Sequence, residues 1–406
     1  MTFLSDSAAA KIWLHQFGDA ERPVAAALVD EILLVGADEF RRGLKQLFDQ
    51  IQSERRDGHP LALYAERKIE ADEGKILPIF GRPGDRRATG LGPSPVLFDP
   101  TAPEVGSEGS IATLITSYQR LHGDHVLDHP GPDLLRGRRA GSIVIVADFI
   151  GSGMRVREML EAFRLVRTVQ SWRSYHLVDF FVVAYTGTEE GLRSVRKHPL
   201  RPRVLTVAGC PTVEQAFRGN QRDAVRRLCL AHPPGFMFPM GFGGSSSLVA
   251  FEHGIPDNAP AILHSDHGGW KPLFPNRSSL AILTAFPASN REGLIARSEE
   301  MLRILDAKRY LADSRAGRWI QTMMVLAAID EGARTCDLIS ARTRVSLRTV
   351  KETLEFTRIT RWTSASGALT TLGRAELQNL RRRRAKAPIL PTARQPFYYP
   401  TQLRAR

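Results

Sequence analysis

Residues 142–155, SIVIVADFIGSGMR, decide how the rest of this 406-residue chain is interpreted. Residues 143–146 form an uninterrupted β-branched run, which is typical of a buried parallel strand. Two glycines and a serine follow, and apolar residues then recur at helical spacing from Val156 to Val169. The pattern therefore predicts a strand, a tight turn and an amphipathic helix in direct succession.

This succession predicts a phosphate site at Gly151, Ser152 and Gly153. Glycines let successive backbone N–H groups converge on an anion, and a helix N-terminus adds partial positive charge. Asp148 falls at the carboxyl end of the strand, where open α/β sheets bind ligands. Its carboxylate could accept hydrogen bonds from sugar hydroxyls or help to hold a phosphate-bound Mg²⁺ ion. The alternative is a tight strand–helix turn without a ligand.

The stretch resembles the phosphoribosyl-pyrophosphate loop of type I phosphoribosyltransferases. In that loop, four apolar residues are followed by two acids and then by two apolar residues. A three-residue turn comes next, which consists of a small residue, then Ser or Thr, then Gly. The chain departs from this pattern at Ala147, where those enzymes usually carry the first acid. The resemblance implies a Rossmann-like parallel sheet, with Asp148 as the catalytic or ribose-binding acid and residues 151–153 around the 5′-phosphate. The missing acid weakens the expected hold on the ribose.

The charge balance favours a polyanionic partner. Fifty-six Lys and Arg residues stand against 43 Asp and Glu residues, which gives a net charge of +13. Nucleic acid is the first candidate for such a partner, and a merely basic protein is the alternative. A hydrophobic content of 43% excludes wholesale disorder. Three cysteines without a CxxC pair argue against a disulfide framework or a zinc ribbon and fit a reducing cytoplasm.

Neither a membrane segment nor a metal site is expected. The N-terminal sequence lacks a basic start followed by an apolar core, and no apolar run approaches membrane-spanning length. A cytoplasmic protein is therefore predicted. His125 and His129 are four residues apart, a spacing that suits a metal on a helix. Because Gly123 and Pro130 flank them, a solvated connector is the favoured interpretation.

Short apolar runs alternate with helical patterns along the middle of the chain. Strands are expected at residues 60–64, 178–185, 203–208 and 247–252. This alternation predicts an α/β domain, a parallel sheet with helices on both faces. The predicted organisation is an N-terminal helical cap (1–58), the α/β domain (59–287), a connecting helix (288–314), a winged helix-turn-helix (315–384) and a basic tail (385–406).

Residues 252–277 follow the last predicted strand and are dense in proline, aromatic and polar residues. Trp270 could stack on a base or sugar, and Lys271 and Arg277 could meet phosphate. Asp257 and Asn258 could read polar edges. The alternative is that this segment only plugs the edge of the sheet. E-x-G-x-P-(D/N)-N followed by W-K-P-L-F-P resembles the phosphoribosyltransferase-like family of bacterial anti-phage loci, which includes effector subunits of some retrons.

Residues 317–384 resemble a winged helix-turn-helix. Ser346 is the expected N-cap of the third helix, and LTTLGRAEL is a common ending in that family. Phosphate contacts are predicted for Arg342, Arg344, Arg348 and Lys351, and a base-edge contact for Arg348 or Thr349. Four consecutive arginines, Arg381, Arg382, Arg383 and Arg384, add a basic run beside this domain. The alternative is a winged helix that contacts only protein.

Two functional hypotheses follow. In the first, the protein is an effector (toxin) of an anti-phage system such as a retron. It acts on nucleotides or phosphoribosyl compounds, with Mg²⁺ as the possible cofactor. Its winged helix then holds it on nucleic acid, either duplex DNA or the multicopy single-stranded DNA and RNA of a retron with its reverse transcriptase. In the second, the core is a catalytically inactive nucleotide sensor, and the protein is a DNA-binding regulator or adaptor.

Overall fold

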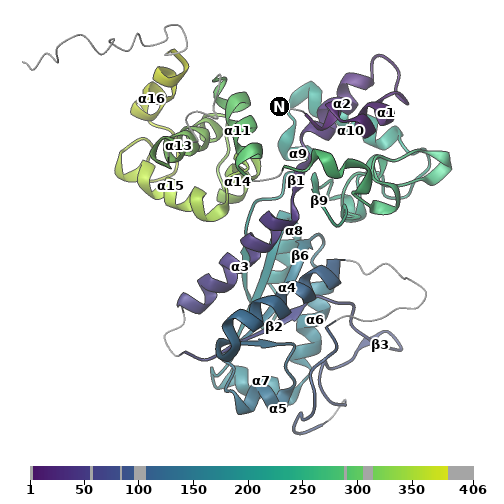
Figure 1. Ribbon diagram of the computed structural model, residues 1–406, viewed down its shortest axis with the longest axis vertical. Coiled ribbons are helices and arrows are strands. Elements are labelled where there is room, and N and C mark those ends of the chain that lie inside the picture. Colours follow the sequence, from purple (N-terminus) through teal and green to yellow (C-terminus); the bar gives the residue numbers. More distant parts are fainter. Residues whose placement is uncertain are drawn as a thin grey trace, which may run out of the picture.

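A computed structural model describes residues 3–54, 58–82, 85–95, 107–287, 290–304 and 314–382, which form three lobes (Figure 1). The main lobe contains a five-stranded, wholly parallel sheet in the order β5-β2-β6-β7-β8. Its strands are β2 (Leu61–Ala65), β5 (Val126–Asp128), β6 (Ser142–Ile150), β7 (Asp179–Gly187) and β8 (Arg203–Thr206). The predicted parallel α/β sheet is confirmed. Among the described residues, no helix combines the length and apolarity needed to cross a membrane.

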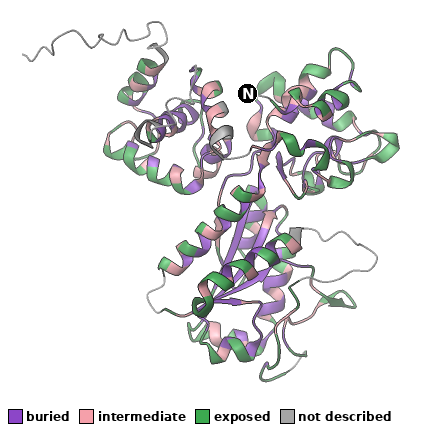
Figure 2. Cartoon of the chain, in the orientation of Figure 1, coloured by how far each residue is buried: buried purple, intermediate pink, exposed green. Residues whose placement is uncertain are grey.

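Helices cover both faces of this sheet, so its strands are buried while the outer helix surfaces are exposed (Figure 2). Successive strand residues point to opposite faces, and Tyr64 and Ile145 therefore enter one core while Leu63 and Val146 enter the other. The first face carries α5 (Pro132–Gly137), α6 (Met154–Arg164), α7 (Arg167–Ser174) and α8 (Glu189–Arg196). The second carries α3 (Ala37–Glu54) and α4 (Ser107–His122). A small hairpin joins β3 (Ala71–Asp72) to β4 (Lys75–Ile76).

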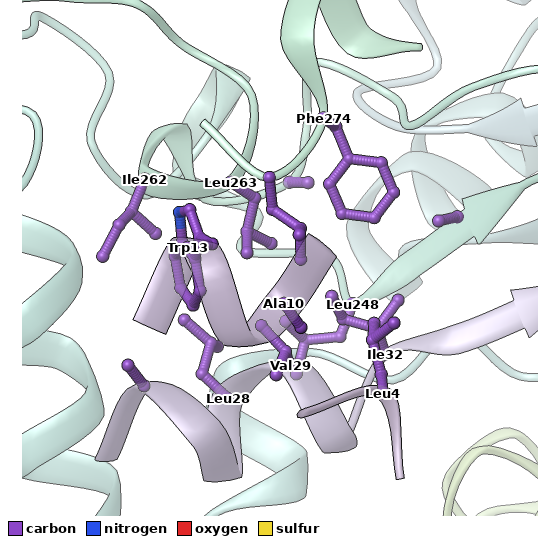
Figure 3. Close-up of a cluster of buried hydrophobic side chains, with 14 of the residues drawn as sticks. Leu4, Ala10, Trp13, Leu28, Val29, Ile32, Leu248, Ile262, Leu263 and Phe274 are labelled. Atoms are coloured by element: carbon purple, nitrogen blue, oxygen red, sulfur yellow. The ribbon is translucent and has the colours of Figure 1, made fainter. Parts of the chain in front are cut away.

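The second lobe, which we call the cap lobe, combines the two ends of the α/β region. It contains α1 (Ala8–Leu14), α2 (Arg22–Asp30), α9 (Val213–Ala216) and α10 (Gly219–Ala231), with several 3-10 turns between Phe242 and Ala285. Trp13, Leu28 and Val29 from the first helices pack with Leu263 and Phe274 (Figure 3).

The prediction that residues 247–252 add a strand to the main sheet is wrong. Strand β9 (Val249–Phe251) pairs instead with β1 (Leu33–Val35), in a separate two-stranded parallel sheet. Leu33 lies opposite Val249, and Val35 lies opposite Phe251. The pairing follows from burial, because all three residues of β9 are buried between the cap lobe and the second face of the main sheet.

The third lobe is the winged helix-turn-helix. Its helices are α11 (Asn290–Leu302), α13 (Ser314–Asp330), α14 (Cys336–Thr343), α15 (Leu347–Ile359) and α16 (Thr371–Arg382). Ser346 caps α15, because its Oγ accepts the N–H of Thr349 at 3.2 Å. The predicted two-stranded wing is reduced to one antiparallel bridge between Thr363 and Leu369. The tail beyond residue 382 lies outside the described residues.

Candidate functional site

The loop predicted to bind phosphate, Gly151–Gly153, which we call the phosphate loop, joins the end of β6 to the start of α6. Gly153 has φ 75°, a left-handed conformation that glycine adopts without a steric penalty. The hydroxyl of Thr188, which caps α8, donates to the carbonyl of Gly151 at 2.6 Å. The N–H of Met154 donates to Ser152 Oγ at 3.3 Å. The end of the neighbouring strand β7 thus holds the loop at the N-terminus of α6.

Asn258 packs directly against this loop. A Cβ added at Gly151 would lie 2.0 Å from Asn258 Oδ1, so only glycine fits there. The Asn258 side chain is itself fixed, because its Nδ2 donates to the Phe242 carbonyl at 3.0 Å and to Ser245 Oγ at 3.1 Å. Asn258, predicted from sequence to read a ligand, supports the loop in this structure.

Asp148 is held at both carboxylate oxygens. Its Oδ1 accepts the N–H of Phe149 at 2.7 Å, and its Oδ2 lies 3.1 Å from Nε2 of His253. The His253 ring stacks on Phe251, with 5.0 Å between centroids. Residues 252–277 therefore reach the loop through His253 and Asn258. Sequence reasoning did not single out His253.

Glu66 is a second carboxyl group at this site and was also missed. It follows β2, and its N–H donates to the carbonyl of Val146 at 2.7 Å, which places it beside Ala147 on the adjacent strand. The residue is 6% exposed, and its Oε1 has no hydrogen-bond partner among the described residues. Burial raises the pKa of Glu66 to about 8, with Arg155 opposing and Asp148 adding to the shift. Burial therefore favours the protonated form of Glu66.

Two arginines complete the cluster, which we call the strand-end cluster: Glu66, Arg67, Glu108, Asp148 and Arg155. Arg155 Nη1 lies 3.7 Å from Glu108 Oε1 on the first turn of α4. Arg67 Nη1 donates to the Ser94 carbonyl at 2.9 Å, while its buried Nε has no partner among the described residues. Burial lowers the pKa of Arg67, and Glu70 and Glu108 oppose that shift. The cluster lies between β2 and β6, where the strand order reverses and α/β sheets bind ligands.

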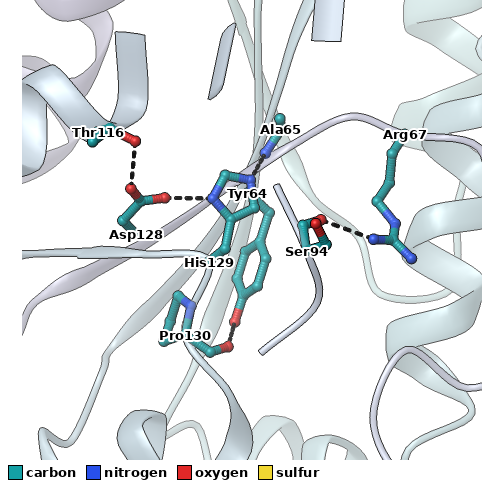
Figure 4. Close-up of polar contacts among 8 residues, drawn as sticks. All are labelled: Tyr64, Ala65, Arg67, Ser94, Thr116, Asp128, His129 and Pro130. Carbon is teal, nitrogen blue, oxygen red and sulfur yellow. Dashed lines mark hydrogen bonds and ion pairs between the residues drawn. The ribbon is translucent and has the colours of Figure 1, made fainter. Parts of the chain in front are cut away.

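His129 fixes the backbone that carries Glu66 (Figure 4). The N–H of Ala65 donates to His129 Nε2 at 2.8 Å, so the ring proton lies on Nδ1, which donates to Asp128 at 2.5 Å. Burial alone would raise the pKa of Asp128, but hydrogen bonds from His129 and Thr116 hold it below its ordinary value. His129, which the sequence placed in a solvated connector, is thus a buried structural group at the end of β5.

The other residues predicted in the 252–277 segment lie elsewhere. Trp270 Nε1 donates to the Ile262 carbonyl at 2.8 Å, and its ring stacks on His232 in the cap lobe. Lys271 is exposed, and its backbone pairs with Gln16. The carbonyls of Asp257 and Arg277 accept the N–H groups of Phe242 and Ile255, and both residues are exposed. No described contact joins these four residues to the strand-end cluster.

The turn of the helix-turn-helix packs against the main lobe. The N–H of Leu347 donates to the carbonyl of Val207 at 2.9 Å, and the N–H of Gly209 donates to Ser340 Oγ at 3.0 Å. Arg344 Nη2 donates to the Asp30 carbonyl at 3.1 Å, and burial lowers the pKa of Arg344. The first turn of α15, the part that enters a groove in DNA-binding members of this fold, thus lies beside the edge of the main sheet.

The remaining predicted nucleic-acid residues are distributed over several surfaces. Arg348 and Lys351 are exposed on α15, and Arg348 Nε pairs with Glu352 at 3.0 Å. Thr349 contacts its own cap at Ser346, and Arg342 faces the cavity described below. Arg381 and Arg382 are the last two residues of α16, and the structure does not describe their side chains. Arg383 and Arg384 lie outside the described residues.

The parallel sheet, the glycine loop at its switch point and the appended helices define a phosphoribosyltransferase-like domain fused to a C-terminal winged helix. The sequence model of the PRTase-CE family matches residues 10–276, and that of the family described as wHTH-PRTase associated matches residues 323–405. The first match spans more than half of the chain, so the protein belongs to the PRTase-CE family. No curated protein and no solved structure matches the chain.

Proposed function

We propose that this protein is an effector enzyme that acts on a phosphoribosyl compound or a nucleotide. The observation that carries the proposal is the meeting of Glu66 and Asp148 beside the phosphate loop. A nucleotide needs an anion site, an acceptor for its sugar hydroxyls and an acid or base near the bond that breaks. These three elements lie at one edge of the sheet.

Each group has a role that suits its chemistry. The backbone amides of the loop and the Ser152 hydroxyl bind the 5′-phosphate, and Asp148 accepts hydrogen bonds from the ribose. Arg67 and Arg155 attract a second anionic group, such as pyrophosphate. As the bond at the anomeric carbon breaks, its electron pair leaves with the departing group. Protonated Glu66 donates its proton to that group, and an acceptor nucleophile takes the carbon.

Glu66 also compensates for the acid that is missing at position 147, where this chain has alanine. The two residues are neighbours on adjacent parallel strands, so a carboxyl group comes to this place from β2 instead of β6. No cluster of three or more His, Cys, Asp or Glu side chains in the described ranges is arranged to hold a metal ion. Asp148 would instead hold a Mg²⁺ ion that accompanies the ligand's phosphates, and such an ion neutralises their charge.

The biological setting in this proposal is anti-phage defence, such as a retron, in the cytoplasm. The net charge of +13 and the winged helix support a nucleic-acid partner that holds the effector, with the system's reverse transcriptase as a possible second partner. The second candidate is a catalytically inactive nucleotide sensor that acts as a regulator or adaptor. Ala147 favours it, as does the packing of the helix-turn-helix on the sheet edge.

Calorimetric titration of phosphoribosyl pyrophosphate with Mg²⁺, and of common nucleotides, tests the proposal. We expect the wild type to bind one of these and Asp148→Ala to lose that binding. Asp179→Ala is the matched control, because Asp179 is exposed and begins β7 at the opposite edge of the same sheet. Binding followed by product formation supports the enzyme, and binding without turnover supports the sensor. No binding by the wild type would overturn both.

A further inference from the structure

A polar cavity lies between the cap lobe and the third lobe, apart from the strand-end cluster. Its volume is about 350 Å³, within the range of small-molecule sites. The cap lobe contributes residues around α9 and the start of α10, the segment after α11 contributes Arg303, and the winged helix contributes Arg342 and Glu331. We call this space the junction cavity.

Four arginines and three glutamates line the junction cavity. One arginine is already neutralised, because Arg297 Nη1 lies 2.7 Å from Glu300 Oε2 and 3.2 Å from Glu31 Oε1. Burial opposes the charge of Arg297, but those two carboxylates still raise its pKa. Apart from this group, Arg218, Arg303 and Arg342 stand against Glu331, and across the whole lining four guanidinium groups exceed three carboxylates by one charge. The cavity therefore carries an excess of positive charge.

Two of these guanidinium groups converge from different lobes. Arg218 Nη2 in the cap lobe and Arg342 Nη1 on α14 both donate to the carbonyl of Glu331, the latter at 3.2 Å. In the part of the chain that the structure describes, each uses one of its five N–H donors in this way. Burial and the nearby charge of Arg218 lower the pKa of Arg342. An anion between them would relieve this repulsion.

Further groups in the lining suit an anion. Arg218 is the N-cap of α10, and Gln221 lies on the first turn of that helix, so the positive end of its dipole faces the cavity. Gln215 also lines the cavity. Its amide oxygen, Oε1, is buried and has no hydrogen-bond partner among the described residues. A rotated amide would present its N–H₂ donors there.

We propose that the junction cavity binds a small phosphate-bearing molecule through Arg218 and Arg342, and that this ligand holds the winged helix against the cap lobe. The ligand contacts residues from two lobes, so it binds the docked arrangement better than an undocked one and shifts the population towards it. The site differs from the phosphate loop in place and residues, so it can exist whether or not the proposed function is correct.

Inorganic phosphate is the probe for this site, and thermal unfolding of the full chain is the measurement. The phosphate loop would also bind the probe, so all variants carry Ser152→Asp, which places a repelling carboxylate there. At constant ionic strength, saturating phosphate should raise Tm by about 3 °C relative to chloride. Arg218→Gln and Arg342→Gln should each remove at least half of that rise. Arg348→Gln, on the exposed side of α15, should retain it.

An absent rise, or an equal rise in the Arg218→Gln and Arg342→Gln variants, would overturn the site. Arg218 is exposed, so its substitution should leave the fold intact. Arg218→Lys keeps the charge and should restore part of the rise. Hydrogen exchange tests the holding role separately. Phosphate should slow exchange in α14 and α15 at least threefold, and unchanged exchange despite a higher Tm would show a ligand that does not hold the winged helix.

Discussion

His253 Nε2 lies 3.1 Å from Asp148 Oδ2, although 105 residues separate the two in sequence. Asp148 belongs to the main lobe, and His253 follows β9 at the boundary of the cap lobe. The contact means that the candidate site is complete only when the two lobes are packed together.

The phosphate loop gives the first prediction. Gly151→Ala should weaken binding of the phosphoribosyl or nucleotide ligand more than about tenfold, because the new methyl group collides with Asn258 Oδ1 and displaces the loop. Calorimetry measures this loss. The matched control is Gly137→Ala, where an added Cβ meets nothing within 4 Å. Equal affinity in the two variants would show that the loop does not bind the ligand.

Glu66 gives a prediction about pH. Its pKa rises from 4.5 in the unfolded chain to about 8 when folded, so the folded state binds the extra proton between these values. Stability therefore falls as pH rises from about 4.5 to 8, by up to about 1.4 kcal/mol per pH unit from this group. Glu66→Gln cannot ionise and should lose that slope. Denaturant unfolding at pH 5, 6, 7 and 8 checks it, and parallel curves for the two proteins would refute the buried proton.

The hydrogen bonds of His129 predict a positioning role. Asp128→Asn should free the ring to take the other tautomer and cost about 1–3 kcal/mol, since the N–H of Ala65 loses its acceptor. The pH dependence of ligand binding should also shift, because Glu66 follows Ala65 directly. His125→Gln, at an exposed position nearby, is the control. A stability loss without any change in the pH profile would confine His129 to a structural role.

The docked helix-turn-helix predicts a gain of function. A Cβ on Gly209 would lie 2.1 Å from the carbonyl of Asp337, so Gly209→Val should push α14 away from the main lobe. Nucleic-acid affinity should then rise about tenfold, because the turn and the start of α15 become accessible. Fluorescence anisotropy measures affinity, and small-angle scattering verifies undocking. Gly18→Ala, in open space, is the control. Undocking without tighter binding would argue for a winged helix that contacts protein.

The exposed cations of α15 give the last prediction. Arg348→Glu together with Lys351→Glu should weaken nucleic-acid binding, and the logarithm of affinity should fall less steeply with salt, by about 2 units of slope. Substituting Arg193 and Arg196 on α8 in the same way gives the charge-matched control. Wild-type binding that ignores salt would contradict the electrostatic interpretation.

Sequence reasoning could predict local features of this fold well. The β-branched run of β6, the glycine turn and the Ser346 cap each carry their signal within a few residues. The pairing of β1 with β9 carries no such signal, because three-residue strands have almost no periodicity and their partners are far apart in sequence.

The site was harder to predict for the same reason. Glu66 is a candidate site residue only because it lies beside Ala147. That placement depends on the order of strands in the sheet. From sequence, Trp270 could equally well bind a ligand or pack in a core. In the structure it packs against the aromatic rings of Phe17 and His232. The buried setting of Arg344 depends on how two lobes dock, which no local pattern records.

The cap lobe also has a consequence for synthesis on the ribosome. Trp13, Leu28 and Val29 emerge early, yet the side chains that cover them, including Leu263 and Phe274, emerge more than 200 residues later. The apolar faces of the first helices therefore have nothing to pack against until most of the α/β region has been translated. His253 and Asn258 arrive in that same late segment, so a nascent or truncated chain that ends before residue 253 has no complete site. The candidate site therefore cannot form until at least 258 of the 406 residues have been translated.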